Sequence, residues 1–365
     1  MVQPAVWAYI SKKYKMNFLK QRIAVVFHIS LFLLLTACNN TGSAKKTQKS
    51  SEDTTAKTTQ VKIDTPKPVI LDTNRYKAAV MRLCHDSASA KWPVKKDVFP
   101  LGGALLPFNR IVAYYGNFYS KRMGILGELP PDEMLKKLMG EVKKWKEADS
   151  TTPVIPAIHY ICVTAQGQPG KAGKYILRMP FKEIDKAIEL AKQINAVVFL
   201  DVQTGQSTLK EEIPLLEQYL KMPNVHMAID PEFSMKTGKK PGSIIGTFDA
   251  EDINYVSEYL AKLVRDYKLP PKILCVHRFT FGMVTNYEKI KLRPEVQTVM
   301  DMDGWGFPAK KVTTYRQTVF GDPVQFTGFK LFYKNDILTA PWNKAPMTPQ
   351  EVLKLYPKPI YIQYQ

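Results

Sequence analysis

The chain has 365 residues, of which 45% are hydrophobic, so it is long and apolar enough for a large globular domain and is not a wholly disordered protein. Its formal net charge of +19 favours anionic partners. The sequence contains no RNA-binding aromatic motif and no basic helix, however, and we expect no nucleic-acid partner. The four cysteines form no CxxC or Cys/His pattern, which excludes a zinc-finger type of site.

Residues 1–38 have the pattern of a bacterial lipoprotein signal. Five Lys or Arg and no acidic residue occur in this segment, and an apolar run over residues 23–35 leads to Leu-Thr-Ala-Cys. A basic start, a short apolar run and small residues at a cleavage point are typical of secretory signals, and the run is too short for a membrane span. The ending resembles a lipobox, which implies cleavage after Ala37 and lipidation of Cys38. We therefore expect a cell-envelope protein anchored to a membrane through Cys38, at the outer membrane or the cell surface.

Residues 39–68 consist mainly of Thr, Ser, Lys and Gln, and they predict a disordered linker because they have too few apolar side chains to form a core. Residues 69–109 predict a small N-terminal cap with one helix over residues 73–83. The main domain is expected over residues 110–365.

Apolar runs and amphipathic helix patterns alternate along residues 110–365. Strands are expected at 111–115, 154–162, 196–202, 225–230, 272–276, 296–302, 327–333 and 359–364. Helices are expected at 131–147, 181–194, 209–220, 249–267, 284–290, 309–320 and 348–355. Continuous apolar strands between helices are typical of a parallel sheet, and eight of them predict a closed (β/α)8 TIM-like barrel. A doubly wound sheet is the alternative, but no GxGxxG follows the first strand.

Polar residues follow the expected strands, always at the same end. The strands of a parallel barrel all point one way, so these residues are expected to meet at the carboxyl-end face, where barrel enzymes bind their substrates. The candidate catalytic residues are Asp201, Asp230, Glu232 and Asp303. The candidate substrate-binding residues are Tyr115, Asn117, Gln203, His277, Trp305 and Lys330.

Asp230 and Glu232 are two positions apart, which on a strand puts both on one face with Cα atoms roughly 6–7 Å apart. Crowded carboxylates raise the pKa of at least one member, giving a protonated acid beside an ionised partner. Glycoside hydrolysis uses such a pair, so we predict a glycosidase acting on a polysaccharide. Glu232 is the expected acid, and Asp230, Asp201 or Asp303 is the expected second carboxylate.

Two other functions use the same residues. A divalent cation held by these groups would activate water for phosphoester or amide hydrolysis; without it, no cofactor is expected. The candidate ligands for this alternative are Asp201, Asp230, Glu232, His277 and Asp301. In the third hypothesis the barrel binds a glycan without cleaving it. His159, within the second strand, is interpreted as a core histidine.

The strand-end motifs resemble those of a family of exported bacterial lipoproteins, which is itself similar to the glycoside-hydrolase-like TIM-barrel superfamily. The resemblance covers about residues 110–365 and implies the barrel fold and export, but it assigns no reaction and no catalytic residues. The matching motifs are Tyr115-Gly116-Asn117, Leu200-Asp201-Val202-Gln203, Asp230-Pro231-Glu232-Phe233, Val276-His277-Arg278-Phe279-Thr280 and Met302-Asp303-Gly304-Trp305-Gly306.

Overall fold

The computed structural model describes residues 69–365 except residues 97, 339–341 and 343. The expected signal, the lipidated Cys38 and the linker all lie outside the described residues. The described part belongs to one compact unit, Thr65–Gln365. None of its helices is long and apolar enough to cross a membrane.

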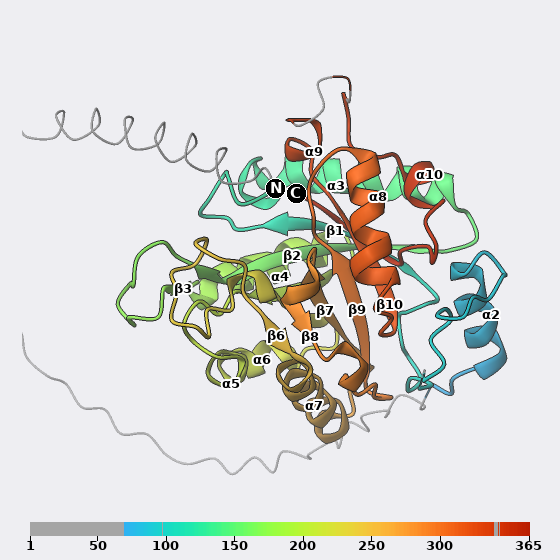
Figure 1. Ribbon diagram of the computed structural model, residues 1–365, viewed down its shortest axis with the longest axis horizontal. Coiled ribbons are helices and arrows are strands. Elements are labelled where there is room, and N and C mark those ends of the chain that lie inside the picture. Colours follow the sequence, from blue (N-terminus) through green and yellow to red (C-terminus); the bar gives the residue numbers. More distant parts are fainter. Residues whose placement is uncertain (1–68, 97, 339–341, 343) are drawn as a thin grey trace, which may run out of the picture. The chain divides into compact units, whose positions relative to one another are not determined.

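Eight parallel strands form a closed barrel (Figure 1). They are β1 (Arg110–Gly116), β2 (Val154–Ala165), β4 (Val197–Val202), β5 (Val225–Ile229), β7 (Lys272–Arg278), β9 (Val296–Met302), β10 (Phe326–Leu331) and β11 (Tyr361–Tyr364). β1 pairs in parallel with both β2 and β11, which closes the sheet. The predicted (β/α)8 barrel is therefore confirmed, and β9 has the predicted bounds.

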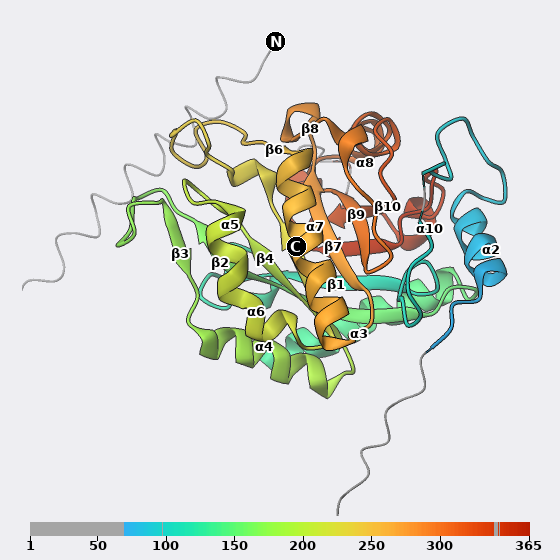
Figure 2. The ribbon, with the colours of Figure 1, turned by 90° about the horizontal axis from the view of Figure 1, so that it is seen from below.

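Helices lie outside the ring of strands (Figure 2). The longer ones are α3 (Pro131–Ala148), α4 (Phe181–Gln193), α7 (Ala250–Tyr267) and α8 (Pro308–Tyr315), which continues into a π-helical turn at Arg316–Phe320. The short ones are α5 (Leu209–Glu212), α6 (Glu217–Leu220), α9 (Asn335–Leu338) and α10 (Pro349–Val352). Three short strands complete the fold: β3 (Ile176–Arg178), antiparallel to the end of β2, and the pair β6 (Phe248–Asp249) and β8 (Val284–Thr285).

Two predicted helices differ from the structure. The expected helix over 209–220 is divided into α5, a 3-10 segment at Ile213–Leu216 and α6, because Pro214 has no backbone N–H to donate to a continuous helix. The expected helix over 284–290 is wrong: β8 pairs with β6 instead. Asn286 then adopts a left-handed φ of 53°, and only a short 3-10 turn follows it, at Tyr287–Lys289.

Strand residues face alternately into the barrel and toward the helices, which gives two apolar clusters. In β1, Ile111 and Ala113 lie in the interior cluster, and Val112 and Tyr114 lie in the outer one. The helix α2 (Thr73–Leu83), drawn in blue in Figure 1, contributes two side chains to the interior cluster. This packing covers the amino-terminal end of the barrel, so the polar strand ends lie at the opposite face.

Gly328 of β10 leaves room for Asp301, its register partner on β9. A Cβ added at position 328 would lie 2.5 Å from Asp301 Oδ1, and both residues are buried. We expect Gly328→Ala to lower the free energy of unfolding by ~1–3 kcal/mol, as overpacked cores do. Chemical denaturation measures this change.

Gly140→Ala is the matched control, because Gly140 is an exposed residue inside α3 whose added Cβ meets nothing within 4 Å. It should leave stability unchanged or raise it by up to ~1 kcal/mol through helix propensity. Equal stability of Gly328→Ala and the wild type would contradict the tight fit around Asp301.

Candidate functional site

Polar side chains from seven of the barrel strands converge inside the barrel at its carboxyl end. Alternation along each strand directs them inward, in line with the interior apolar residues below them. They are almost completely buried, in contrast to the usual exposure of charged groups. The residues are Tyr115 of β1, His159 of β2, Asp201 of β4, His277 of β7, Asp301 of β9, Lys330 of β10 and Gln363 of β11.

His277 lies at the centre of this group. Its Nε2 is 3.3 Å from Asp201 Oδ2, and its Nδ1 is 3.1 Å from Asp303 Oδ2 and 3.5 Å from Asp301 Oδ2. Burial by itself lowers the pKa of His277, but the charges of Asp201 and Asp303 outweigh burial and raise that pKa well above its ordinary value. His277 is therefore a cation at neutral pH, held between carboxylates on both ring nitrogens.

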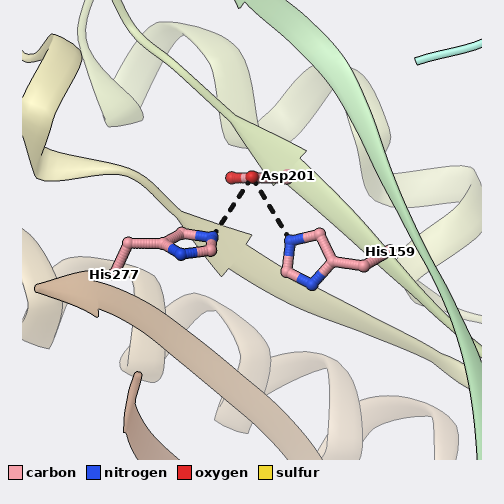
Figure 3. A group of neighbouring side chains, drawn as sticks. All are labelled: His159, Asp201 and His277. Atoms are coloured by element: carbon pink, nitrogen blue, oxygen red, sulfur yellow. Dashed lines mark ion pairs between the residues drawn. The ribbon is translucent and has the colours of Figure 1, made fainter. Parts of the chain in front are cut away.

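Asp201 also contacts a second histidine, His159 (Figure 3). His159 Nε2 lies 3.3 Å from the same Oδ2 that faces His277, and His159 Nδ1 lies 2.5 Å from the hydroxyl of Tyr361. Burial lowers the pKa of His159 to about 4, although Asp201 acts in the opposite direction, so this imidazole is neutral at pH 7. His159 is therefore a buried, hydrogen-bonded histidine, as interpreted from the sequence, and it also belongs to the polar cluster.

Asp303 and Lys330 form a buried ion pair. Lys330 Nζ lies 2.9 Å from Asp303 Oδ1 and 3.6 Å from the centroid of the Tyr115 ring. Burial raises the pKa of Asp303, but the charges of Lys330 and His277 outweigh it and lower the pKa below its ordinary value. Asp303 is therefore ionised. At 9% exposure it is also more accessible than Asp201, Asp230 or Asp301.

Asp230 and Glu232 do not share a strand face as predicted. β5 ends at Ile229, and Pro231–Phe233 form a 3-10 turn whose N-cap is Asp230. Asp230 Oδ1 accepts a hydrogen bond of 3.0 Å from the backbone N–H of Glu232, and Oδ2 accepts one of 3.2 Å from Gln203 Nε2. Proline cannot donate to a strand ladder, so the extended conformation stops there and Glu232 lies in the turn and not on the strand.

Glu232 has the raised pKa that the sequence argument expected. It is partly buried, and burial, together with the charges of Asp230 and Asp303, raises its pKa to about 8. Burial also raises the pKa of Asp230 to about 7. At neutral pH Glu232 is mostly protonated, whereas Asp303 is ionised.

The expected substrate-binding residues lie in different surroundings. Asn117 is buried and uses its amide on the backbone, donating 2.8 Å to Ile161 O and accepting 2.8 Å from Tyr119 N. Gln203 is likewise buried and bridges Asp230 and the backbone N–H of Ala165. Trp305 is 45% exposed, with Lys310 Nζ 4.8 Å from its ring centroid. Trp305 is thus the accessible aromatic residue of the expected set.

One group among the described residues has the composition and spacing of a metal site. His159, Asp201 and His277 each offer a ligand atom within 4.8 Å of the other two (Figure 3). This set retains Asp201 and His277 from the predicted metal ligands and adds His159. The interior position of His159 on β2 was the signal that could have identified it.

Comparisons with known proteins add little to this description. No protein-family model matches the chain, and no curated protein matches it. Among solved structures, the chain is similar to a ruminal GH26 endo-β-1,4-mannanase, with 12% sequence identity and a TM-score of 0.33. The similarity covers 71% of this chain and 59% of the length of the mannanase. A similarity this low carries no argument about function or substrate.

Proposed function

We propose that this protein is a glycoside hydrolase in which Glu232 is the general acid and Asp303 the second carboxylate. The observation that carries the proposal is that these two carboxyl groups, at the same end of the barrel, differ in protonation state. Glu232 keeps its proton at neutral pH, while an ion pair with Lys330 keeps Asp303 charged. A glycosidase needs this division, because the leaving oxygen must gain a proton as a carboxylate stabilises or attacks the sugar carbon.

Asp303 suits the second role better than the other predicted carboxylates. Asp201 has no exposed surface and lies between two imidazoles, so no sugar ring can approach it. Asp230 accepts two hydrogen bonds, one of which stabilises the turn that carries Glu232. Asp303 lies at the rim and is followed two residues later by the exposed indole of Trp305.

In the proposed reaction a sugar unit stacks on Trp305 and its glycosidic bond lies between Glu232 and Asp303. Glu232 transfers its proton to the leaving oxygen as the bond to the sugar carbon breaks. Asp303 either attacks that carbon or removes a proton from the attacking water. Location at the cell envelope through lipidated Cys38 is part of the proposal and rests on the sequence alone.

The pH dependence follows from the pKa of Glu232. The acid form is the active form, and with a pKa of about 8 it predominates at neutral pH and is lost as the pH rises past that value. We expect kcat/KM to hold up to neutral pH and then to fall about tenfold per pH unit above the pKa. A decline that begins near pH 5, where an ordinary glutamate would already be ionised, would contradict this role.

A panel of polysaccharides tests the proposed function. The full-length protein should bind at least one of them and release new reducing ends, detected by a colorimetric assay and by chromatography of the products. Binding without any new reducing end would instead indicate the non-catalytic glycan-binding protein.

A further inference from the structure

Two histidines and one aspartate meet below the proposed catalytic groups, at a depth that no substrate needs to reach. We propose that His159, Asp201 and His277 bind one divalent transition-metal ion. All three side chains are completely buried and come from separate strands, β2, β4 and β7 (Figure 3). The inference is independent of glycoside hydrolysis, since it concerns a different set of atoms and its test requires no substrate.

Two of the three distances between the donor atoms fit a metal better than direct hydrogen bonds. Both Nε2 atoms are 3.3 Å from the same Asp201 oxygen. Tetrahedral ligands at bond lengths of about 2.0–2.2 Å lie about 3.3–3.5 Å from one another. Hydrogen bonds from imidazole to carboxylate are shorter, about 2.7–2.9 Å. Within the described residues, neither oxygen of Asp201 and neither of these Nε2 atoms takes part in a hydrogen bond.

The outer partners orient both imidazoles toward the same point. His159 Nδ1 faces the Tyr361 hydroxyl at 2.5 Å, and His277 Nδ1 faces the Asp303 carboxylate at 3.1 Å. Metal-bound histidines commonly donate their other N–H to such a group, which leaves the remaining nitrogen free for the metal. Gln363 Nε2 also approaches His159 Nδ1, at 3.0 Å. The Oε1 atom of Gln363 receives no hydrogen bond from the described residues. If the amide rotates by half a turn when a metal binds, Oε1 takes the place of Nε2 and can accept a hydrogen bond from the Nδ1–H of His159.

The donor set selects the kind of metal. Two imidazole nitrogens and one carboxylate oxygen suit Zn²⁺, Co²⁺ or Fe²⁺, whereas Mg²⁺ and Ca²⁺ prefer oxygen ligands throughout. Three protein ligands leave at least one position for water. The ring of Tyr115 lies 5.1 Å from the His159 ring and 5.8 Å from the His277 ring, centroid to centroid, and it is 4% exposed.

The position of the ion also defines how it acts on Asp303, one of the proposed catalytic groups. A metal on Nε2 of His277 displaces the proton from that nitrogen and leaves the other proton on Nδ1, which faces the Asp303 carboxylate at 3.1 Å. The ion therefore positions Asp303 through His277, and the ring of Tyr115 packs against both histidine rings. Its expected role is to order the site, and binding should be measurable in the absence of any reaction.

Metal titration of the full-length protein tests the inference directly. After chelator treatment and dialysis, calorimetry should detect one equivalent of Zn²⁺ per chain, and Co²⁺ should develop the visible absorption bands of a four- or five-coordinate ion. Mg²⁺ and Ca²⁺ should bind at least ~100-fold more weakly. Zn²⁺ should also raise Tm in a concentration-dependent manner, because it binds only the folded state.

Variants separate this site from adventitious binding. His159→Phe keeps an aromatic ring and removes both nitrogens, so it should weaken Zn²⁺ binding by more than the ~10–100-fold typical of losing an outer partner. Tyr361→Phe, which removes such a partner, should fall within that range. His226→Phe is the matched control: His226 is buried in the barrel on β5, outside the cluster, and its loss should leave Zn²⁺ affinity unchanged. Absence of Zn²⁺ binding by the wild type, or equal loss in His159→Phe and His226→Phe, would overturn the proposal.

Discussion

Glu232→Gln should lower kcat/KM for glycan hydrolysis by ~10²–10⁴-fold, the range that a general acid contributes. The amide has nearly the shape of the protonated carboxyl group but has no acidic proton for the leaving oxygen. Burial and the neighbouring carboxylates hold the pKa of Glu232 at about 8, so the wild type has this proton at neutral pH. The measurement is initial-rate kinetics at pH 7 on the polysaccharide that the panel identifies.

Two further results accompany this loss if Glu232 is an acid and not a structural residue. The Kd for the glycan should change little, because the Gln amide has a hydrogen-bond donor and an acceptor in nearly the same positions as the protonated carboxyl group. Glu251→Gln, at an exposed position at the start of α7, is the control and should retain full activity. A Glu232→Gln protein that hydrolyses glycan at the wild-type rate would remove Glu232 from the mechanism.

The same variant has a predictable effect on stability. The pKa of Glu232 is raised in the folded state, so folding favours its proton, and this contribution is complete below the unfolded pKa of about 4.3. It is lost progressively as the pH rises from there to about 8. Gln cannot ionise, so above pH 8 the unfolding free energy of Glu232→Gln should equal or exceed that of the wild type.

Lys330→Met should lower the free energy of unfolding by ~3–5 kcal/mol, the usual cost of removing one partner of a buried ion pair. Lys330 is 2% exposed and its Nζ contacts the Asp303 carboxylate at 2.9 Å, so the variant leaves that carboxylate without its nearest cation. Catalysis should fall as well, because Asp303 then loses the charge that keeps it ionised. Urea denaturation and kinetics at pH 7 measure the two effects.

A matched control and a double variant make this prediction specific. Lys334, four residues after Lys330, forms an exposed ion pair with Glu128. Lys334→Met breaks this pair and should lower the free energy of unfolding by less than ~1 kcal/mol. Lys330→Met combined with Asp303→Asn should cost less than the sum of the single changes, since no buried carboxylate is then left without its lysine partner. Equal stability of Lys330→Met and Lys334→Met would contradict a strong buried pair.

Much of the barrel was predictable because its strands are continuous apolar runs between amphipathic helices. The apolar positions of α4 show why: Ile184, Ala187, Ile188 and Ala191 recur at helical spacing, and all of them are buried. The interior direction of Asp201 and His277 also followed from alternation along a strand. The helix predicted over residues 284–290 does not form, because the strand pairing of β8 with β6 prevails over the weak helical periodicity of that segment.

The site was only partly predictable, for reasons that its residues make clear. The convergence of Asp201, His277 and Lys330 followed from parallel strands that end at one face. His159 lies within β2, six residues before the strand ends at Ala165, and carries no strand-end signal. The position of Glu232 in a turn depended on Pro231, and the pairing of Asp303 with Lys330 required three-dimensional proximity that sequence spacing does not encode.

The dependence of the rate on the leaving group tests the central claim most directly. An aryl glycoside with a strongly acidic phenol leaves without protonation, whereas a sugar hydroxyl requires an acid. On the sugar that the panel identifies, Glu232→Gln should lose ~10²–10⁴-fold in kcat/KM with the natural glycan and less than about tenfold with the dinitrophenyl glycoside. Equal losses on both substrates, or no loss on either, would contradict Glu232 as the general acid at this barrel mouth.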